Sequence, residues 1–173
     1  MAKINGFELK GVKEFKGHEG EPCYQGNIYL NGKKVGYFSS SYTMGPMDVR
    51  FDKPEIEKLF RETAKCYIEN YPEQFDGSGI MWPENSEWFD EEMLIYELLS
   101  IKDWEKVAKN EFKNGYTSMV MLFNMEGIDT KQYVEDRTTG RLFREPVPTN
   151  YQPPENHKLL RIVTNIDQFN IAF

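Results

Sequence analysis

The sequence predicts an α+β fold, an antiparallel sheet built from hairpins with two to three helices packed on one face. Three observations support this prediction. Residues 7–39 have strand patterns, residues 52–114 have apolar residues at helical spacing, and residues 117–171 return to strand patterns. Strands and helices that are segregated along a chain are typical of α+β folds.

The length and composition favour one domain. A chain of 173 residues is long enough to bury a sizeable core, and its aromatic content of 14% argues against disorder. We expect a single domain over residues 1–173, with an N-terminal hairpin part (1–50), a helical part (51–116) and a C-terminal strand part (117–173).

The first part of the chain predicts three strands. The segment FELKGVKEFKG, residues 7–17, alternates apolar and polar residues, and Gly11 is the expected position of a bulge. Asn31 and Gly32 separate two further strand segments, CYQGNIYL and KKVGYFS. Asn-Gly is a strong hairpin signal, because both turn residues adopt a positive φ angle. We therefore expect a hairpin that turns at residues 31–32.

The middle of the chain predicts helices. Pro54 and Glu55 suit a first helical turn. The apolar residues that follow recur at helical spacing: Ile56, Leu59, Phe60, Thr63, Ala64 and Tyr67. Residues 86–115 predict one long helix, or two that break near Ser100, and Gly115 is the expected cap. The expected buried side of its first half consists of Met93, Leu94, Tyr96, Leu98 and Leu99.

The last part of the chain predicts strands again. Residues 116–125, YTSMVMLFNM, are almost continuously apolar, which is typical of a central strand. Residues 131–147 predict a second hairpin with its turn near Thr139-Gly140, and residues 158–166 predict a final strand. The apolar residues of the tail, DQFNIAF, are expected to dock on the fold.

The acidic excess is concentrated in the middle of the chain. The net charge is −7, divided into +2 for residues 1–50, −8 for residues 51–116 and −1 for residues 117–173. This distribution disfavours a nucleic-acid binder that depends on phosphate contacts, and it permits a protein that docks on a basic surface. Acidic helix faces that only keep a protein in solution would give the same counts.

The segment MWPENSEWFDEE, residues 81–92, contains the densest acidic run, formed by Glu84, Glu87, Asp90, Glu91 and Glu92. Two carboxylates can hydrolyse a glycoside, but such a pair needs two different environments, and this run reads as uniformly solvated. Trp82 and Trp88 lie among the acids. Since aromatic residues anchor interfaces and carboxylates attract basic partners, we predict that these seven residues bind a partner. Packing of Trp88 at the helix start is an equally supported interpretation.

The segment GHEGEPC raises the possibility of a metal site. His18, Glu19 and Glu21, joined by Asp48, are residue types that ligate a divalent cation in hydrolases. A polar turn is the favoured interpretation, because a short loop does not hold ligands rigidly. The sequence has no nucleotide-binding, zinc-protease, serine-hydrolase or CxxC motif, so we expect no catalytic residue and no cofactor. Free thiols are expected at Cys23 and Cys66, because the N-terminus lacks a secretory signal.

The segment GHEGEPCYQGNIYLNGKKVGYFSSS, followed by MGP, resembles a pattern in small accessory proteins of phages and mobile elements in Firmicutes, loosely the type II anti-CRISPR proteins. The resemblance covers residues 5–52. It implies inhibition of an RNA-guided DNA nuclease by binding, in the cytoplasm of the bacterial host. Such a nuclease holds its nucleic acids in a basic channel, which an acidic protein of the DNA-mimic kind can occupy.

The sequence therefore favours a non-enzymatic inhibitor whose partner is a CRISPR effector nuclease with its guide RNA, with no direct DNA binding and no membrane contact. Two alternatives stay open. One is a metal-dependent nuclease or other hydrolase that uses the His18 loop, and the other is a homo-oligomeric interaction module, such as a homodimer, without a defence role.

Overall fold

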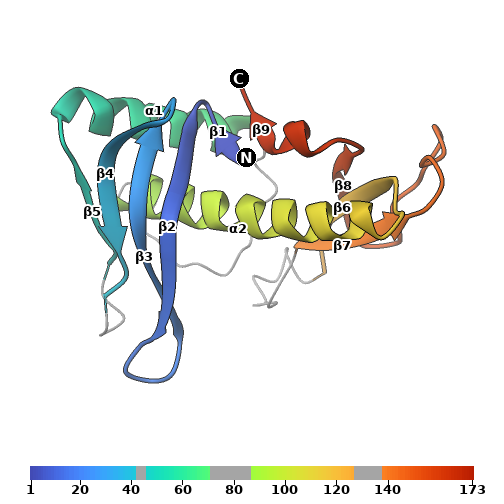
Figure 1. Cartoon of the computed structure of the whole chain (residues 1–173), viewed down its shortest axis with the longest axis horizontal. Coiled ribbons are helices and arrows are strands. Elements are labelled where there is room, and N and C mark those ends of the chain that lie inside the picture. The colour runs from blue at the N-terminus through green and yellow to red at the C-terminus, as the bar shows by residue number, and fades with distance from the viewer. Residues whose placement is uncertain (42–45, 71–86, 127–137) are drawn as a thin grey trace. The chain divides into compact units, whose positions relative to one another are not determined.

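A computed structural model describes residues 1–41, 46–70, 87–126 and 138–173, and of residues 87–90 it describes the backbone alone (Figure 1). The elements are β1 (Lys3–Ile4), β2 (Phe7–Lys16), β3 (Pro22–Leu30), β4 (Lys33–Ser39), β5 (Asp48–Phe51), α1 (Pro54–Asn70), α2 (Glu87–Lys113), β6 (Ser118–Asn124), β7 (Thr138–Phe143), β8 (His157–Val163), the 3-10 helix η2 (Ile166–Phe169) and β9 (Asn170–Ile171). This content confirms the α+β class. No helix in the described ranges is both long and apolar enough to span a membrane.

The described residues divide into two compact units. The first unit contains residues 1–41, 46–67, 87–102 and 170–173, and the second contains residues 68–70, 103–126 and 138–169, so that α2 contributes to both. The first unit has a six-stranded sheet in the order β5-β4-β3-β2-β1-β9, and the second has a three-stranded sheet in the order β7-β6-β8. The chain thus builds two sheets where the sequence predicts one.

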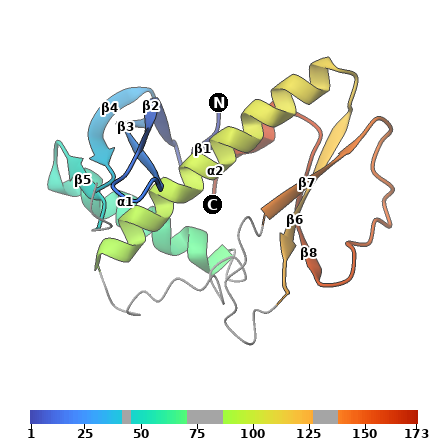
Figure 2. The same cartoon turned by 90° about the horizontal axis from the view of Figure 1, so that it is seen from below.

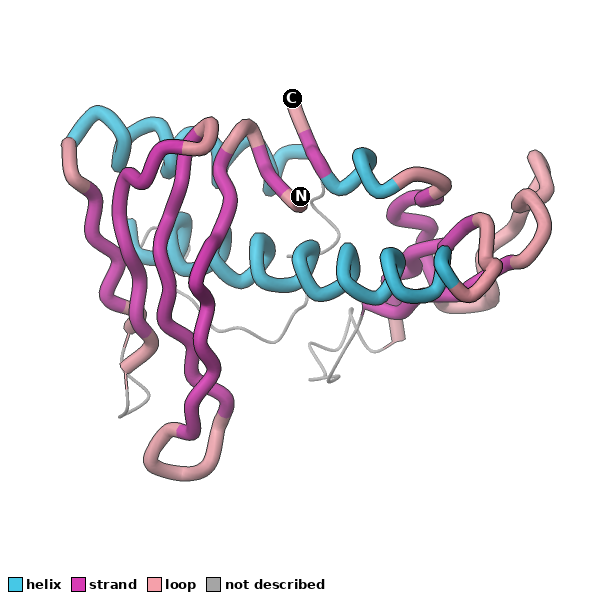
Figure 3. Tube along the Cα trace, viewed as in Figure 1, coloured by secondary structure: helices cyan, strands magenta, loops and turns pink. Residues whose placement is uncertain are grey.

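The hairpin that the sequence predicts around residues 31–32 forms in the first unit (Figure 3). β3 and β4 pair around Asn31 and Gly32, whose φ angles of 49° and 83° satisfy a two-residue hairpin turn. The β2–β3 register shifts between Lys10 and Lys13, which confirms the predicted bulge at Gly11. Because a bulge increases local twist, β2 and β3 curve as they continue toward the loop at residues 17–21.

Both helices lie on the same side of strands β2–β5, as the two views in Figures 1 and 2 agree. The core of this unit includes three phenylalanines in contact: the ring of Phe60 on α1 lies 4.9 Å from that of Phe7 and 5.1 Å from that of Phe51. From α2, Leu94, Ile95 and Leu98 are almost fully buried. Packing of helices on one face of the sheet is therefore confirmed in this unit.

The C-terminal tail docks on the first unit, as predicted. β9 pairs with β1 in parallel, which makes the sheet mixed rather than purely antiparallel. The Asn5 amide donates a hydrogen bond of 2.8 Å to the Ile171 carbonyl, and the Phe173 amide donates one of 2.9 Å to Asn5 Oδ1. Ile171 is 7% exposed, so its side chain contributes to the core.

The helix predictions hold in outline and fail at two residues. Residues 87–113 form one helix, with no break at Ser100. Gly115, at a φ angle of 89°, ends it in a Schellman motif, in which the Tyr116 amide bonds the Glu111 carbonyl and the Gly115 amide bonds that of Phe112. Leu59 and Tyr96, which helical spacing places on the buried faces, are each 42% exposed, because the observed buried stripes are narrower than those predicted.

In the second unit, β6 is the central strand, as predicted, and its first six residues are buried. The predicted turn near Thr139-Gly140 is wrong: both residues lie within β7, where Gly140 pairs with Met121. The physical reason is close packing by Trp104, since a Cβ atom on Gly140 would lie 2.6 Å from Trp104 Cζ3. Glycine marks close approach of a ring here rather than a turn.

Candidate functional site on the outer face of the first sheet

We call the side of the six-stranded sheet opposite the helices the outer face. Strand residues alternate between the two faces, so the buried Phe7, Leu9, Ile28 and Phe38 define the helix side. Their neighbours along each strand point to the outer face, where they form three rows across the strands. The first row is Glu8, Tyr29 and Lys34, and the second is Lys10, Asn27, Tyr37 and Arg50. The third row is Lys13, Gln25, Ser39 and Asp48. No described element of the first unit covers this face.

The outer face is basic, although the chain is acidic. Its rows, together with Lys3 beside Glu8, hold five cations (Lys3, Lys10, Lys13, Lys34 and Arg50) and two carboxylates (Glu8 and Asp48), a net of 5 − 2 = +3. The whole chain has a net charge of −7. Charge is therefore segregated, and this face presents the sign that attracts anions.

Glu8 anchors one end of the face. Its side chain is 2% exposed, and its Oε1 lies 3.2 Å from Lys10 Nζ and 3.7 Å from Lys3 Nζ. Lys10 Nζ also lies 4.6 Å from the centre of the Tyr29 ring, a cation–π contact. A buried carboxylate with two cationic partners holds those lysines in place, so Lys10 contributes a fixed positive charge.

Tyr37 lies further along the face and is 38% exposed. The Arg50 guanidinium lies 5.7 Å from the centre of its ring, and Arg50 Nε donates a 3.1 Å hydrogen bond to Asp48 Oδ1. That hydrogen bond and the charge of Asp48 raise the pKa of Arg50 above its ordinary value. The ring is thus held beside a permanent cation, with the rest of its surface open to solvent.

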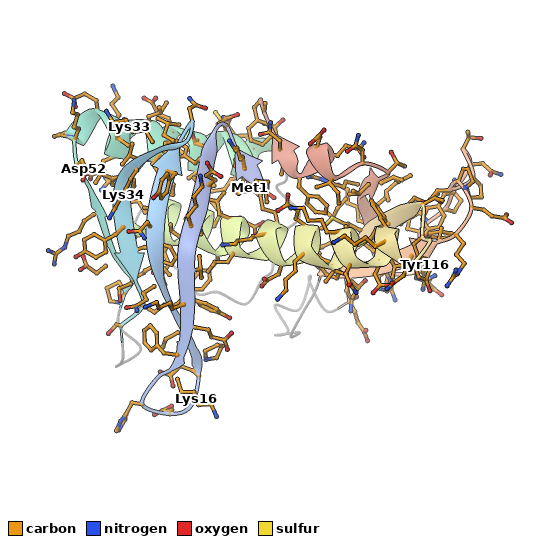
Figure 4. The ribbon with its side chains drawn as sticks, viewed as in Figure 1. Met1, Lys16, Lys33, Lys34, Asp52 and Tyr116 are labelled. Atoms are coloured by element: carbon orange, nitrogen blue, oxygen red, sulfur yellow. The ribbon has the colours of Figure 1, made fainter. Side chains whose placement is uncertain are left out.

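A shallow hollow of about 530 Å³ lies on the outer face beside Tyr37 and Asp48, and its lining is mainly polar. It forms over Gly11, which has no side chain, and is bordered by Lys13, Lys34 and Tyr37. Lys13 and Lys34 form no ion pair within the described part of the chain. In Figure 4, Lys33 and Lys34 lie near the β3–β4 turn and Lys16 lies at the opposite end of β2. Unpaired lysines, an exposed aromatic ring and side-chain amides can together hold phosphate groups and stack a base.

Of the seven residues predicted to bind a partner, the structure describes the side chains of two, Glu91 and Glu92. Trp82 and Glu84 lie outside the described residues, and Glu87, Trp88 and Asp90 lie in the first turn of α2 with undescribed side chains. Glu91 and Glu92 point into the first unit instead of solvent. Glu91 Oε1 lies 2.7 Å from Arg61 Nε, and Glu92 is 8% exposed and accepts a hydrogen bond of 3.4 Å from the Met47 amide. The expectation of a uniformly solvated run is wrong for these two acids.

Burial affects the protonation of Glu92 and its neighbour. Loss of solvent raises the pKa of Glu92, although hydrogen bonds from the Met47 amide and from Tyr96 oppose that rise. Loss of solvent and the adjacent Glu92 carboxylate raise the pKa of Tyr96 to about 12. The Glu92 carboxylate is therefore buried and hydrogen-bonded within the first unit, while the Tyr96 side chain stays 42% exposed.

The structure does not bring the alternative metal ligands together. His18 is exposed on its turn, and Glu21 Oε2 accepts a 2.9 Å hydrogen bond from the Glu19 amide within the same turn. Asp48 lies on β5, bonded to Arg50. Among the residues for which the structure gives positions, no three His, Cys, Asp or Glu side chains gather as a metal site would require.

Both cysteines are free thiols in the structure, as predicted. Cys23 is buried, and its Sγ lies 3.7 Å from the Ser41 carbonyl. Loss of solvent, with a smaller effect from Glu21, raises the pKa of this thiol. A raised pKa reduces the thiolate fraction, which is the opposite of what a cysteine nucleophile needs.

Sequence reasoning missed the outer face, although the signal was present. Residues 1–50 have a net charge of +2 in a chain of −7, and strand alternation places Lys10, Asn27 and Tyr37 on one side. Joining those two observations required the register between strands, which the sequence does not specify for β2 and β5. Comparison of the chain with protein-family models, with curated proteins and with solved structures found no significant match.

Proposed function

We propose that this chain is a non-enzymatic binding protein, an inhibitor of an RNA-guided DNA nuclease of the kind that its first hairpin resembles. In this proposal it binds the guide-loaded nuclease, and the outer face contacts exposed guide RNA. The observation that supports this most directly is Tyr37, an exposed ring beside Arg50 in a sheet face with a net charge of +3.

The chemistry of the outer face suits RNA better than it suits a basic protein surface. Lysines and arginine neutralise phosphates, an exposed tyrosine ring stacks on an unpaired base, and Asn27 and Gln25 offer donors and acceptors to base edges. Sequence-specific proteins commonly read single-stranded RNA in this way on the open face of a sheet. The overall charge of −7 then limits binding to unrelated nucleic acid, because the rest of the molecule repels phosphates.

The acidic helix surface has weaker support. Glu91 and Glu92 are engaged internally. On α1 the four acids, Glu55, Glu57, Glu62 and Glu69, are interleaved with three cations, Lys58, Arg61 and Lys65, a net of 3 − 4 = −1. A surface of mixed sign does not imitate the regular negative charge of DNA.

A binding role is also favoured over hydrolysis by the contacts of the candidate ligands. Glu21 accepts a hydrogen bond from its own turn, and Asp48 is paired with Arg50. Neither carboxylate is held with an open coordination position beside His18, which metal-assisted hydrolysis would need.

The test measures binding of the full chain to the nuclease with and without guide RNA, by biolayer interferometry at two salt concentrations. The variant K13E/K34E reverses two cations of the outer face. The control K53E/K106E makes the same charge change at exposed lysines that do not belong to the rows of this face. We expect K13E/K34E to lose on the order of tenfold in affinity, while the control retains it.

The same experiment separates the competing proposals. Equal binding to the guide-free nuclease, with no effect of K13E/K34E, would refute a contact with guide RNA. If E87K/D90K abolishes binding while K13E/K34E does not, the acidic start of α2 is the contact surface. Nuclease activity of the chain itself with Mg²⁺, lost in Glu21→Gln, would support the hydrolase alternative.

A further inference from the structure

The second unit contains a pocket that the proposed function does not use. It has a volume of about 490 Å³, which lies within the range of small-molecule sites. Its floor is one face of the three-stranded sheet, with Ser118 on β6 and Leu159 and Ile162 on β8. Its wall is the connection between β7 and β8, from Pro146 to Tyr151.

The strand register explains why this side of the sheet has a pocket. Met119 faces the side on which Trp104 packs, since a Cβ atom on Gly140 would meet both side chains. Ser118 and Val120 therefore face the opposite side, where Ile162 is paired with Val120. The proline-containing connection covers this side without the long apolar side chains of a helix, and space remains beneath it.

Two buried hydroxyls that line the pocket have no hydrogen-bond partner among the described residues. Ser118 is 0% exposed, and its Oγ has no hydrogen-bond partner within the described part of the chain. The hydroxyl oxygen of Tyr151 is likewise buried, with no partner among the described residues. Both residues line the pocket. Buried hydroxyls are ordinarily satisfied, so two without partners beside one cavity indicate that a bound molecule supplies them.

The pocket residues are held in place before any ligand binds. The Tyr151 ring packs edge-on against Phe143, with centroids 5.8 Å apart, and the Tyr151 amide bonds the Pro148 carbonyl at 3.0 Å. The Thr117 amide bonds the Phe143 carbonyl at 2.8 Å. Because both hydroxyl-bearing residues sit on ordered backbone, their geometry is available to a ligand at a low entropic cost.

We propose that this pocket binds a small neutral molecule with an apolar body and a hydrogen-bond acceptor, such as an amide or ketone carbonyl. None of the described residues that line the pocket is charged, so a charged ligand would lose its hydration without a compensating partner. Ser118 and Tyr151 can each donate a hydrogen bond to an acceptor on the ligand. Leu159, Ile162 and Val147 contact the apolar body.

The test uses three probes of similar size with the full-length chain: acetanilide, which is neutral with a carbonyl; ethylbenzene, which has no acceptor; and benzoate, which is charged. Binding is followed by the backbone amide shifts of the ¹⁵N-labelled protein. We expect acetanilide to shift the amides of Thr117, Ser118 and Tyr151, ethylbenzene to bind about tenfold more weakly, and benzoate not to bind.

Two variants connect the affinity to the hydroxyls. S118A and Y151F each remove one hydroxyl while keeping the apolar lining, and each should weaken acetanilide about tenfold without changing the affinity for ethylbenzene. Absence of shifts at these amides with every probe, or equal binding of benzoate, overturns the proposal.

The thermal stability of the ligand-free variants gives a second readout. Because Ser118 Oγ has no partner in the described structure, S118A should unfold at the temperature of the parent or above it. A clear decrease would show that the hydroxyl is already satisfied in the free protein, which also overturns the proposal. Y151F remains an independent test if S118A does not fold.

Discussion

The Arg61 side chain on α1 joins Glu91 on α2 through an Nε–Oε1 distance of 2.7 Å. Arg61 Nη2 also bonds Glu57 Oε1 at 2.8 Å, one turn earlier on α1. The pair with Glu91 is shielded, because the side chains are 28% and 12% exposed. The sequence predicts that Glu91 binds a partner. In the structure its carboxylate instead connects α1 and α2 within the first unit.

Removal of either partner of this pair should destabilise the chain. In Arg61→Met the shielded Glu91 carboxylate loses its ion pair with Arg61, and in Glu91→Gln the Arg61 guanidinium loses one charged acceptor while its bond to Glu57 remains. We expect losses of about 1–3 kcal/mol in the free energy of unfolding, measured by urea denaturation. The control is the exposed pair Lys58–Glu62, whose side chains are 80% and 58% exposed. Its variants K58M and E62Q should change stability by less than about 0.5 kcal/mol, and equal losses at both pairs would contradict the prediction.

The stability of the chain should depend on pH through Glu92. Burial raises the pKa of this carboxyl above its ordinary value of 4.5, so the folded chain holds the proton more tightly than the unfolded chain does. The stability that this group contributes is fully present below pH 4.5 and is lost as the pH rises through the folded-state pKa.

The variant Glu92→Gln removes this dependence, because it keeps the shape of the side chain and has no proton to lose. The difference in unfolding free energy, parent minus E92Q, should decrease between pH 4.5 and pH 7, as measured by urea denaturation at each pH. Glu62→Gln, at an exposed site, is the matched control. A parent-minus-E92Q difference that rises with pH would show that the carboxylate is stabilised rather than penalised.

The sequence was sufficient where one local signal decides the structure. Asn31-Gly32 specifies its turn because few residues tolerate two successive positive φ angles, and the continuous apolar run of residues 119–123 specifies a central strand. Contacts between distant segments were not readable in this way. The internal role of Glu91 depends on Arg61, thirty positions earlier, and helical spacing alone gives no sign of that pairing.

Gly140 is a second example of a contact between distant segments that the sequence does not reveal. Glycine is a common turn residue, but Gly140 instead makes room for Trp104, a residue from another element. The two unpartnered hydroxyls likewise follow from the strand register and from the path of the proline-containing connection, neither of which a single sequence reveals.

The substitution Gly140→Ala should destabilise the second unit. Its Cβ would lie 2.6 Å from Trp104 Cζ3, and the rigid indole must shift to relieve that contact. We expect a loss of about 1–3 kcal/mol in urea denaturation, with a change in tryptophan fluorescence. Thr139→Ala, at the exposed neighbouring position, should have little effect. In the W104F background, where the clashing ring atoms are absent, G140A should cost less, and an unchanged cost would place the strain elsewhere.

The ring of Tyr37 should contribute to partner binding by stacking, separately from charge. Tyr37→Ala removes the ring and should weaken binding to the guide-loaded nuclease by about tenfold, while Tyr37→Phe, which loses only the 3.4 Å contact with Asp48, should bind nearly as well as the parent. The matched control is Tyr116, whose ring also carries an arginine, Arg144, at 4.6 Å, but in the second unit. Tyr116→Ala should leave binding unchanged. If Y37F weakens binding as much as Y37A does, the hydroxyl rather than the ring makes the contact, and base stacking on this face is ruled out.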